Sequence, residues 1–98
     1  MDRTEIIAAL RMHEDALRAR GVIHAALFGS SARGQSGPES DIDILITLAP
    51  DTAIGLFEYV GITQYLADLF PARVDVANRD RLKPMIRDRI ERDAINAF

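Results

Sequence analysis

The chain has 98 residues, of which 48% are hydrophobic and 28% charged, a composition typical of a globular protein and not of a disordered one. Its formal net charge of −3 gives no reason to expect a broad nucleic-acid-binding surface, and the absence of cysteine excludes disulfides, thiol nucleophiles and thiolate zinc sites. No apolar stretch approaches the roughly 18 residues of a membrane span, and no secretory signal opens the chain, so we expect one small cytoplasmic domain, residues 1–98.

The first half of the chain predicts a helix, a strand and a long connection. Apolar residues recur at helical spacing over residues 3–20, with Asp2 and Glu5 as a capping arrangement at the start and Gly21 as the C-terminal stop. Residues 22–28 are short and apolar, which predicts a strand. Residues 29–40 are rich in Gly and Pro and predict a connection, with one helical turn near residues 31–33.

The second half predicts two more strands and two more helices. Strands are expected over residues 42–48 and 73–77, separated by a helix from about residue 53 to residue 70. A final helix begins near Lys83 and Pro84 and runs towards Ala97, because proline is tolerated in the first turn. Helices that alternate with strands predict an α/β or α+β fold, with a small sheet of about three strands flanked by helices.

Acidic residues interrupt two of the predicted strands. Side chains alternate along a strand, so Asp41 and Asp43 point to one side and Ile42 and its apolar neighbours to the other. In "RVDVA", Asp75 likewise faces away from the flanking valines. If the two strands are neighbours, three carboxylates converge and repel one another unless a cation lies between them. Hard oxygen ligands favour Mg²⁺ or Mn²⁺ over zinc.

The end of the first strand suggests a phosphate site. Gly29 allows the backbone to approach a ligand closely, and Ser30 and Ser31 offer a hydroxyl and amides at the predicted helical turn. The sequence contains neither a P-loop nor the dinucleotide-binding glycine motif. A phosphate site beside a metal site therefore indicates a nucleoside triphosphate pocket of another kind.

The stretch "GSSARGQSGPESDID", residues 29–43, resembles the signature of the nucleotidyltransferases of the DNA polymerase beta superfamily: Gly-Ser, ten residues, then Asp-x-Asp. It is most similar to the minimal nucleotidyltransferase (MNT) branch, which includes MntA-type antitoxins that act with HEPN-domain toxins. The later "VDV" and the Arg-rich "RLKPMIRDRI" extend the resemblance over the whole chain. The resemblance implies a nucleotidyltransferase fold with a mixed sheet.

The resemblance also implies a role for each motif residue. Asp41 and Asp43 would bind two Mg²⁺ ions (Mn²⁺ being possible), and Asp75 would complete one metal site and help to activate the attacking hydroxyl. Gly29 and Ser30 would hold the β- and γ-phosphates of ATP, with Ser31 beside them. Arg33 would steady the loop or touch phosphate.

The leading hypothesis is an antitoxin that transfers AMP from ATP to a tyrosine hydroxyl of a HEPN ribonuclease toxin and forms a hetero-oligomer with it. The predicted elements use up the chain and leave no domain to hold an acceptor. One alternative is a small-molecule (antibiotic) nucleotidyltransferase that works as a homo-oligomer. The other is a non-catalytic antitoxin that masks the toxin by binding.

Simpler interpretations exist for the same charged residues. The two aspartates of Asp-x-Asp could end a turn, and Asp75 could pair with Arg73 or Arg79. In the last helix, helical spacing predicts the pairs Arg87–Glu91, Asp88–Arg92 and Arg89–Asp93. A solvated, self-paired helix face is the plainest interpretation, and a basic rim near the nucleotide is the alternative. We expect His13 and His24 to be packing or surface residues and not ligands.

Overall fold

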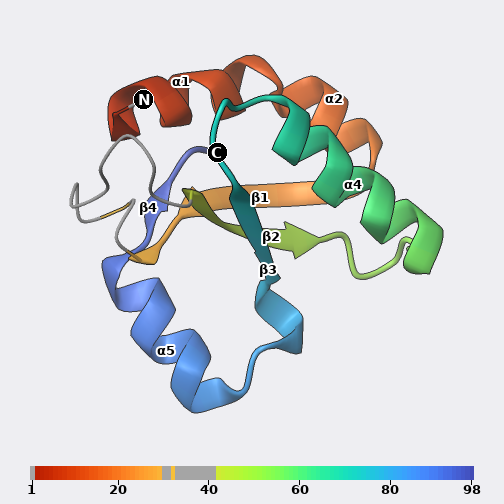
Figure 1. Cartoon of the computed structure of the whole chain (residues 1–98). Helices are drawn as coiled ribbons and strands as arrows, with labels where there is room; N and C mark the ends of the chain where they lie inside the picture. Colours follow the sequence, from red (N-terminus) through yellow and green to blue (C-terminus); the bar gives the residue numbers. More distant parts are fainter. Residues whose placement is uncertain (1, 30–31, 33–41) are drawn as a thin grey trace.

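The structure, a computed structural model, describes residues 2–29, 32 and 42–98 (Figure 1). Its elements are, in chain order, α1 (Arg3–Met12), α2 (Glu14–Ala19), β1 (Val22–Leu27), β2 (Ile42–Leu48), α4 (Leu56–Asp68), β3 (Val74–Asn78), the short 3-10 helix η1 (Arg79–Arg81), α5 (Pro84–Asp93) and β4 (Ile95–Asn96). The expected mixture of helices around a small sheet is confirmed. The sheet has four strands where about three were expected.

The sheet is mixed, with the strand order β3-β2-β1-β4. β1 pairs antiparallel with both β2 and β4, whereas β2 and β3 are parallel. Parallel neighbours require a crossover connection, which α4 provides between β2 and β3. The strands that carry Asp43 and Asp75 are therefore adjacent, as the argument from the acidic residues required.

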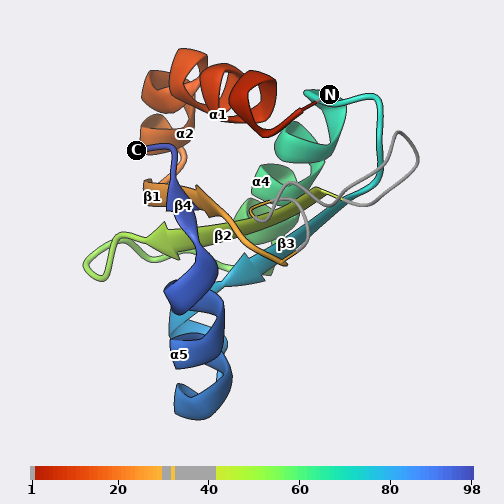
Figure 2. The same ribbon diagram turned by 90° about the vertical axis from the view of Figure 1, so that its left-hand side faces the viewer.

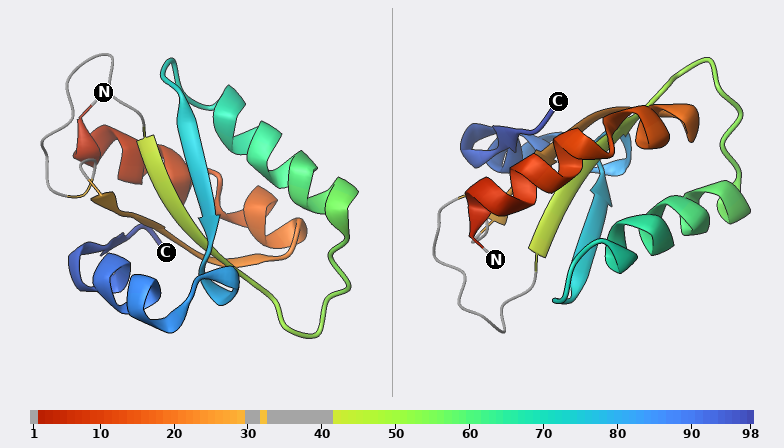
Figure 3. Two further views of the ribbon diagram at one scale, coloured as in Figure 1. Left: turned by 60° about the horizontal axis from the view of Figure 1, so that its bottom comes forward. Right: turned by 90° about the horizontal axis from the view of Figure 1, so that it is seen from above.

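The sheet separates two unequal helical layers. α1, α2 and α4 cover one face, and α5 lies on the other (Figures 2 and 3). The face towards α1, α2 and α4 holds the core, because Ile42, Ile44 and Ile46 share one face of β2 and are almost completely buried. The helices contribute their own buried apolar side chains to this core: Ile6, Leu10, Leu17, Ile62 and Leu66.

The N-terminal segment contains two helices, so the prediction of one continuous helix over residues 3–20 is wrong at its centre. The backbone leaves helical geometry at His13, whose Nδ1 lies 2.6 Å from the hydroxyl of Tyr65 on α4. This tertiary contact accompanies the interruption. The expected ends are confirmed, since Asp2 Oδ1 accepts a hydrogen bond from the Glu5 amide (2.9 Å) and Gly21 has a φ of 100°.

The last helix ends earlier than predicted. α5 stops at Asp93, and the chain then forms β4 beside β1 instead of continuing as a helix towards Ala97. The Ala97 amide donates to the Ala25 carbonyl (2.8 Å), which satisfies backbone groups on the outer edge of β1. The Arg11 side chain donates to the Ala97 carbonyl (2.8 Å) and so ties the C-terminal residues to α1. Backbone pairing therefore overrides the helical pattern here.

The remaining boundaries shift by a few residues. α4 is shorter at both ends than the predicted helix from about residue 53 to residue 70, and η1 was not expected. None of the helices in the described part of the chain is both long enough and apolar enough to cross a membrane.

A substitution in the core tests this packing. Ile44 is 0% exposed and Met12 is 81% exposed. We expect Ile44→Ala to lower the free energy of unfolding by about 2–5 kcal/mol, because it removes buried methyl groups and leaves a cavity. Met12→Ala should change it by less than about 0.5 kcal/mol. Urea unfolding followed by circular dichroism measures both, and equal effects would contradict the assigned core.

Candidate active site

Two of the predicted carboxylates lie next to each other on the sheet. Asp43 of β2 and Asp75 of β3 are direct partners in the parallel ladder. Neighbouring strands are about 4.8 Å apart, and paired residues point to the same face. The pairs on either side, Ile42 with Val74 and Ile44 with Val76, point to the core. The carboxylates therefore lie on the opposite face, the one that carries α5.

Gly29 lies against the first of these carboxylates. The Phe28 amide donates to the Asp43 carbonyl (3.1 Å), which holds the end of β1 beside the start of β2. A Cβ added to Gly29 would lie 2.6 Å from Asp43 Oδ2, and the φ of Gly29 is 65°, in the left-handed region. Only glycine fits both conditions without strain. Gly29, Asp43 and Asp75 thus follow one another across β1, β2 and β3.

Four predicted site residues lie outside the described residues: Ser30, Ser31, Arg33 and Asp41. Their roles stay predictions. Ala32, which lies among them in sequence, is 3% exposed, and its carbonyl accepts a hydrogen bond from the Arg3 side chain (2.9 Å). Ala32 is therefore tied to the start of α1.

Helix α5 lies opposite Gly29. From the sequence, a position of this helix near the nucleotide was only the alternative interpretation. A hollow of about 290 Å³ is lined by Phe28, Gly29, Ile86, Arg89, Ile90 and Asp93. The last four share one face of α5, because residues three and four apart are neighbours on a helix. Arg89 and Asp93 bring one positive and one negative charge to the side of the Gly29 turn. The signal in the sequence was the helical spacing of these residues, but only the fold shows which surface they face.

The ion pair of Asp75 with Arg73 is a surface pair. Arg73 Nε lies 3.6 Å from Asp75 Oδ1, and these side chains are 77% and 46% exposed. An exposed pair of this kind contributes about 0–1 kcal/mol, too little to fix Asp75 in a purely structural role. Arg79, the other partner considered for Asp75, instead contacts Glu91 of α5 and, at 3.5 Å, Asp80.

The predicted pairing along α5 is therefore wrong for Arg87–Glu91 and for Asp88–Arg92. Glu91 takes its partner from η1, and neither of these two pairs forms an ion pair in the described part of the chain. A contact between distant segments has replaced one between helical neighbours.

The residues that the structure describes supply only part of the predicted ligand set for a hard cation. Asp43 and Asp75 supply carboxylate oxygens from adjacent strands, the ligand type that Mg²⁺ prefers. Within residues 2–29, 32 and 42–98, no group of three or more His, Cys, Asp or Glu residues is close enough to hold a metal. The third predicted ligand, Asp41, is not among these residues. His13 bonds Tyr65 and His24 is exposed, as expected for residues that are not ligands.

The contact between Gly29 and Asp43 gives a test that needs no ligand. Gly29→Ala should lower the free energy of unfolding by about 1–2 kcal/mol from the left-handed φ alone, and further through contact with the Asp43 carboxylate. When Asp43 is also replaced by alanine, the destabilisation that comes from contact with its carboxylate should vanish. A double-mutant cycle should therefore give a coupling free energy of about 1 kcal/mol between the two positions.

Gly61→Ala is the matched control, because Gly61 lies within α4 and alanine favours helix. A Cβ at Gly61 would lie 3.3 Å from Arg20 Nη1, the end of a flexible side chain, so this control should lower stability much less than Gly29→Ala. Strictly additive effects of Gly29→Ala and Asp43→Ala would contradict the contact.

Comparison with known proteins identifies relatives over almost the whole chain. The family profile described as nucleotidyltransferase domain matches residues 10–96. The protein adenylyltransferase MntA of Thermococcus cleftensis is 33% identical over 92 residues, covering 93% of this chain and 91% of that protein. A proposed protein adenylyltransferase of Methanocaldococcus jannaschii, MJ1379, is 33% identical over 94 residues, or 94% of either chain.

Solved structures share the fold. A proposed minimal nucleotidyltransferase superposes with a TM-score of 0.81 at 27% identity, covering 97% of this chain and 95% of that one. A toxin–antitoxin complex with AMP-PNP gives a TM-score of 0.70 at 19% identity, covering 100% and 73%. A tri-AMPylated Shewanella oneidensis HEPN toxin in complex with MNT antitoxin gives a TM-score of 0.64 at 16% identity, covering 94% of this chain and 71% of that one. At these identities, the similarity to the two toxin–antitoxin structures concerns the fold alone. The chain is a nucleotidyltransferase and belongs to the nucleotidyltransferase domain family, in its minimal branch with the MntA protein adenylyltransferases.

Proposed function

We propose that this chain is a Mg²⁺-dependent protein adenylyltransferase, an antitoxin that transfers AMP from ATP to a tyrosine hydroxyl of a HEPN-domain ribonuclease toxin and thereby neutralises it. The observation that carries the proposal is the row formed by Gly29, Asp43 and Asp75 across three strands. The names of the relatives and the toxin–antitoxin complexes among the structural neighbours support the same activity.

The motif residues of the proposed site divide phosphate binding, cation binding and proton transfer among them. Gly29, Ser30 and Ser31 hold the β- and γ-phosphates of ATP, and Arg33 adds positive charge beside them. The acceptor oxygen forms a bond to the α-phosphorus, the bond from that phosphorus to the oxygen bridging to the β-phosphate breaks, and pyrophosphate leaves. Asp75 accepts the proton that the hydroxyl loses, since its side chain is 46% exposed and open to an approaching acceptor.

A divalent cation would be held by Asp41, Asp43 and Asp75, and Mn²⁺ would serve in place of Mg²⁺. When bound, such an ion offsets the negative charge on the α-phosphate and lowers the pKa of the attacking hydroxyl. The residues that the structure describes contribute two of these three carboxylates, side by side.

The surface beside the site favours a protein acceptor over a small polar molecule. Met85 and Ile86 of α5 are 77% and 46% exposed, and Ile86 lines the hollow next to Gly29. Exposed apolar side chains that adjoin a site are typical of protein interfaces. The antibiotic-modifying alternative has no comparable observation in its favour. The masking alternative predicts the same interface but no transfer of AMP. The following experiment distinguishes it from the proposed activity.

Intact mass spectrometry of the partner tests the activity. Incubated with Mg²⁺, ATP and a HEPN-type partner, the wild-type chain should add one or more AMP groups to the partner. Asp75→Asn should slow the addition about 10²–10⁴-fold, because the amide does not accept the proton. Asp41→Asn combined with Asp43→Asn should stop it.

Asp68→Asn at the exposed end of α4 makes the same chemical change away from the site and should have no effect. Neutralisation of the toxin by the Asp41/Asp43 double variant, without any adduct from the wild type, would establish masking instead. Rapid adenylylation of a free antibiotic would establish the small-molecule alternative.

Thermal unfolding tests the cation site without any turnover. The adjacent carboxylates repel each other, so Mg²⁺ at about 100 times its Kd should stabilise the chain by about 2.7 kcal/mol, and Mg²⁺ with ATP by more. Asp43→Asn should weaken this response while leaving the far-ultraviolet circular dichroism unchanged. An undiminished Mg²⁺ response in Asp43→Asn would remove Asp43 from the cation site.

A further inference from the structure

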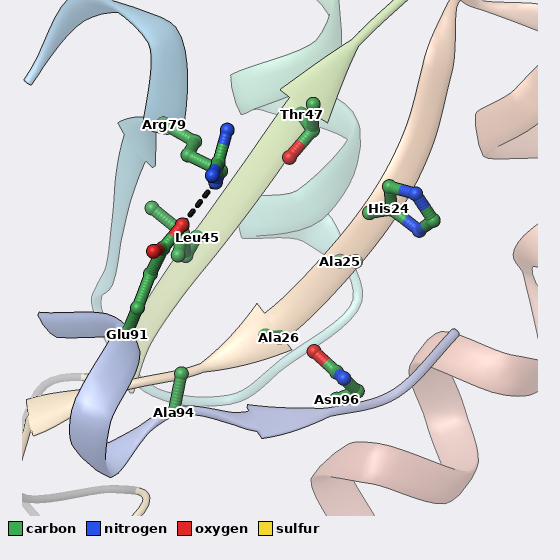
Figure 4. A pocket seen from close by; sticks show the side chains of 9 residues that line it. All are labelled: His24, Ala25, Ala26, Leu45, Thr47, Arg79, Glu91, Ala94 and Asn96. Carbon is green, nitrogen blue, oxygen red and sulfur yellow. Dashed lines mark hydrogen bonds and ion pairs between the residues drawn. The ribbon is translucent and has the colours of Figure 1, made fainter. Parts of the chain in front are cut away.

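Away from Gly29, the sheet carries a hollow at Thr47, on the same face as the carboxylates (Figure 4). It has a volume of about 340 Å³, and Arg79 and Glu91, which both line it, pair with each other. Ala26 and Leu45 also line it, but each is only 5% exposed. The hollow at Thr47 therefore offers a ligand little apolar surface, and its arginine and glutamate are already paired.

A larger hollow, of about 430 Å³, lies at the opposite end of β2 and β3 from the carboxylates, and we call it the hollow at Arg81. Leu48 and Asn78 line it, and they end the strands that carry Asp43 and Asp75 near their beginnings. Alternation puts both lining residues on the core face of the sheet, whereas the two carboxylates point to the other face. The hollow at Arg81 is therefore separate from the candidate active site.

Apolar side chains make up much of the lining of the hollow at Arg81. They are Leu48, Ile54, Leu56 and Leu82. Leu56, the first residue of α4, is 77% exposed, so a large apolar side chain lies uncovered at this hollow. Burying a leucine completely stabilises by about 1.5–3 kcal/mol, so a ligand with an apolar body would gain free energy here. Small-molecule sites typically combine such a volume and apolar lining with a few polar groups.

The polar side chains of the same hollow, those of Tyr59, Asn78 and Arg81, can all donate hydrogen bonds. Asn78 Oδ1 accepts a hydrogen bond from the Asp80 amide (3.2 Å), which leaves the N–H groups of the Asn78 side chain for a ligand. Burial raises the pKa of the Tyr59 hydroxyl, and the positive charge of Arg81 offsets only part of this rise. The hydroxyl therefore stays protonated at neutral pH. Three donors in one hollow favour a ligand that carries an acceptor group.

Arg81 also gives the hollow one positive charge. None of the residues that line it is acidic, and the Arg81 side chain forms no ion pair with any residue that the structure describes. Asp80 lies 3.5 Å from Arg79 instead, and Glu58 lies beside Gly55 but lines a neighbouring hollow. A single guanidinium matches a monoanion in charge and a carboxylate in its planar geometry.

We propose that the hollow at Arg81 binds a small amphipathic carboxylate. The carboxylate group accepts hydrogen bonds from Arg81, Asn78 and Tyr59, and the apolar body of the ligand packs against Leu56 and Leu82. This ligand and a nucleotide in the candidate active site bind at the same time, because the two sites lie at opposite ends and on opposite faces of the sheet. Binding requires neither ATP nor a partner protein, so it is independent of the transferase activity proposed above.

Amide chemical shifts of the wild-type chain test the proposal with 4-phenylbutyrate, a probe that joins an apolar body to one carboxylate. It should shift the signals of Leu56, Tyr59 and Arg81 with a Kd of about 1 mM or lower, and leave those of Gly29 and Asp43 in place. The uncharged 4-phenylbutan-1-ol has the same apolar body and should bind about tenfold more weakly. No shift at about 10 mM 4-phenylbutyrate, or equal affinity for the alcohol, would overturn the proposal.

A change of charge in the hollow gives a second test. Arg81→Gln should weaken the binding of 4-phenylbutyrate about tenfold and leave that of the alcohol unchanged. Arg92→Gln makes the same change at an exposed position of α5 outside the hollow and should alter neither affinity. Leu56→Ser should weaken both probes, because it removes part of the apolar lining, and the exposure of Leu56 makes this change tolerable for the fold. Equal effects of Arg81→Gln and Arg92→Gln would contradict the assigned carboxylate contact.

Competition with the nucleotide tests whether the hollow is a site of its own. Saturating Mg²⁺ and ATP should leave the affinity for 4-phenylbutyrate unchanged. If the nucleotide displaces the probe, the probe lies in the candidate active site and the separate carboxylate site is refuted, whatever the outcome for the proposed transferase activity.

Discussion

The parallel pairing of β2 with β3 is the constraint on which the candidate site depends. It places Asp43 beside Asp75, and the same register packs Ile44 beside Val76 on the opposite face. The two carboxylates therefore cannot separate unless the core also moves. Like charges about 5 Å apart at a protein surface repel by about 1–3 kcal/mol, a cost that burial of the isoleucines offsets. The fold thus holds together two groups that would otherwise move apart.

The antiparallel pairing of β1 with β2 completes the arrangement. Since β1 ends where β2 begins, the chain that leaves β1 at Gly29 passes directly over the Asp43 carboxylate. A phosphate held at Gly29 would consequently adjoin a cation held by Asp43.

Short-range patterns in the sequence were sufficient for β1, β2 and β3 and for the shared face of Asp43 and Asp75. Alternation along β2 and β3 has a period of two, and a buried face leaves little freedom in register. The errors arose where distant contacts decide the structure. β4 has only two residues and forms through backbone bonds to β1, which no side-chain pattern reveals. The interruption at His13 accompanies a contact with Tyr65, and Glu91 pairs with Arg79 instead of with a neighbour on its own helix.

Helix α5 links two of the hollows. One of its faces, with Ile86 and Arg89, lines the hollow at Gly29, and Glu91 on another face lines the hollow at Thr47. Its position is fixed at both ends, by the contact of Glu91 with η1 directly after β3 and by β4 directly after the helix. Because β3 carries Asp75 and β4 pairs with β1, the strands that hold the proposed catalytic groups also fix this helix. The two hollows are therefore set by the same sheet, although they are lined by different faces of α5.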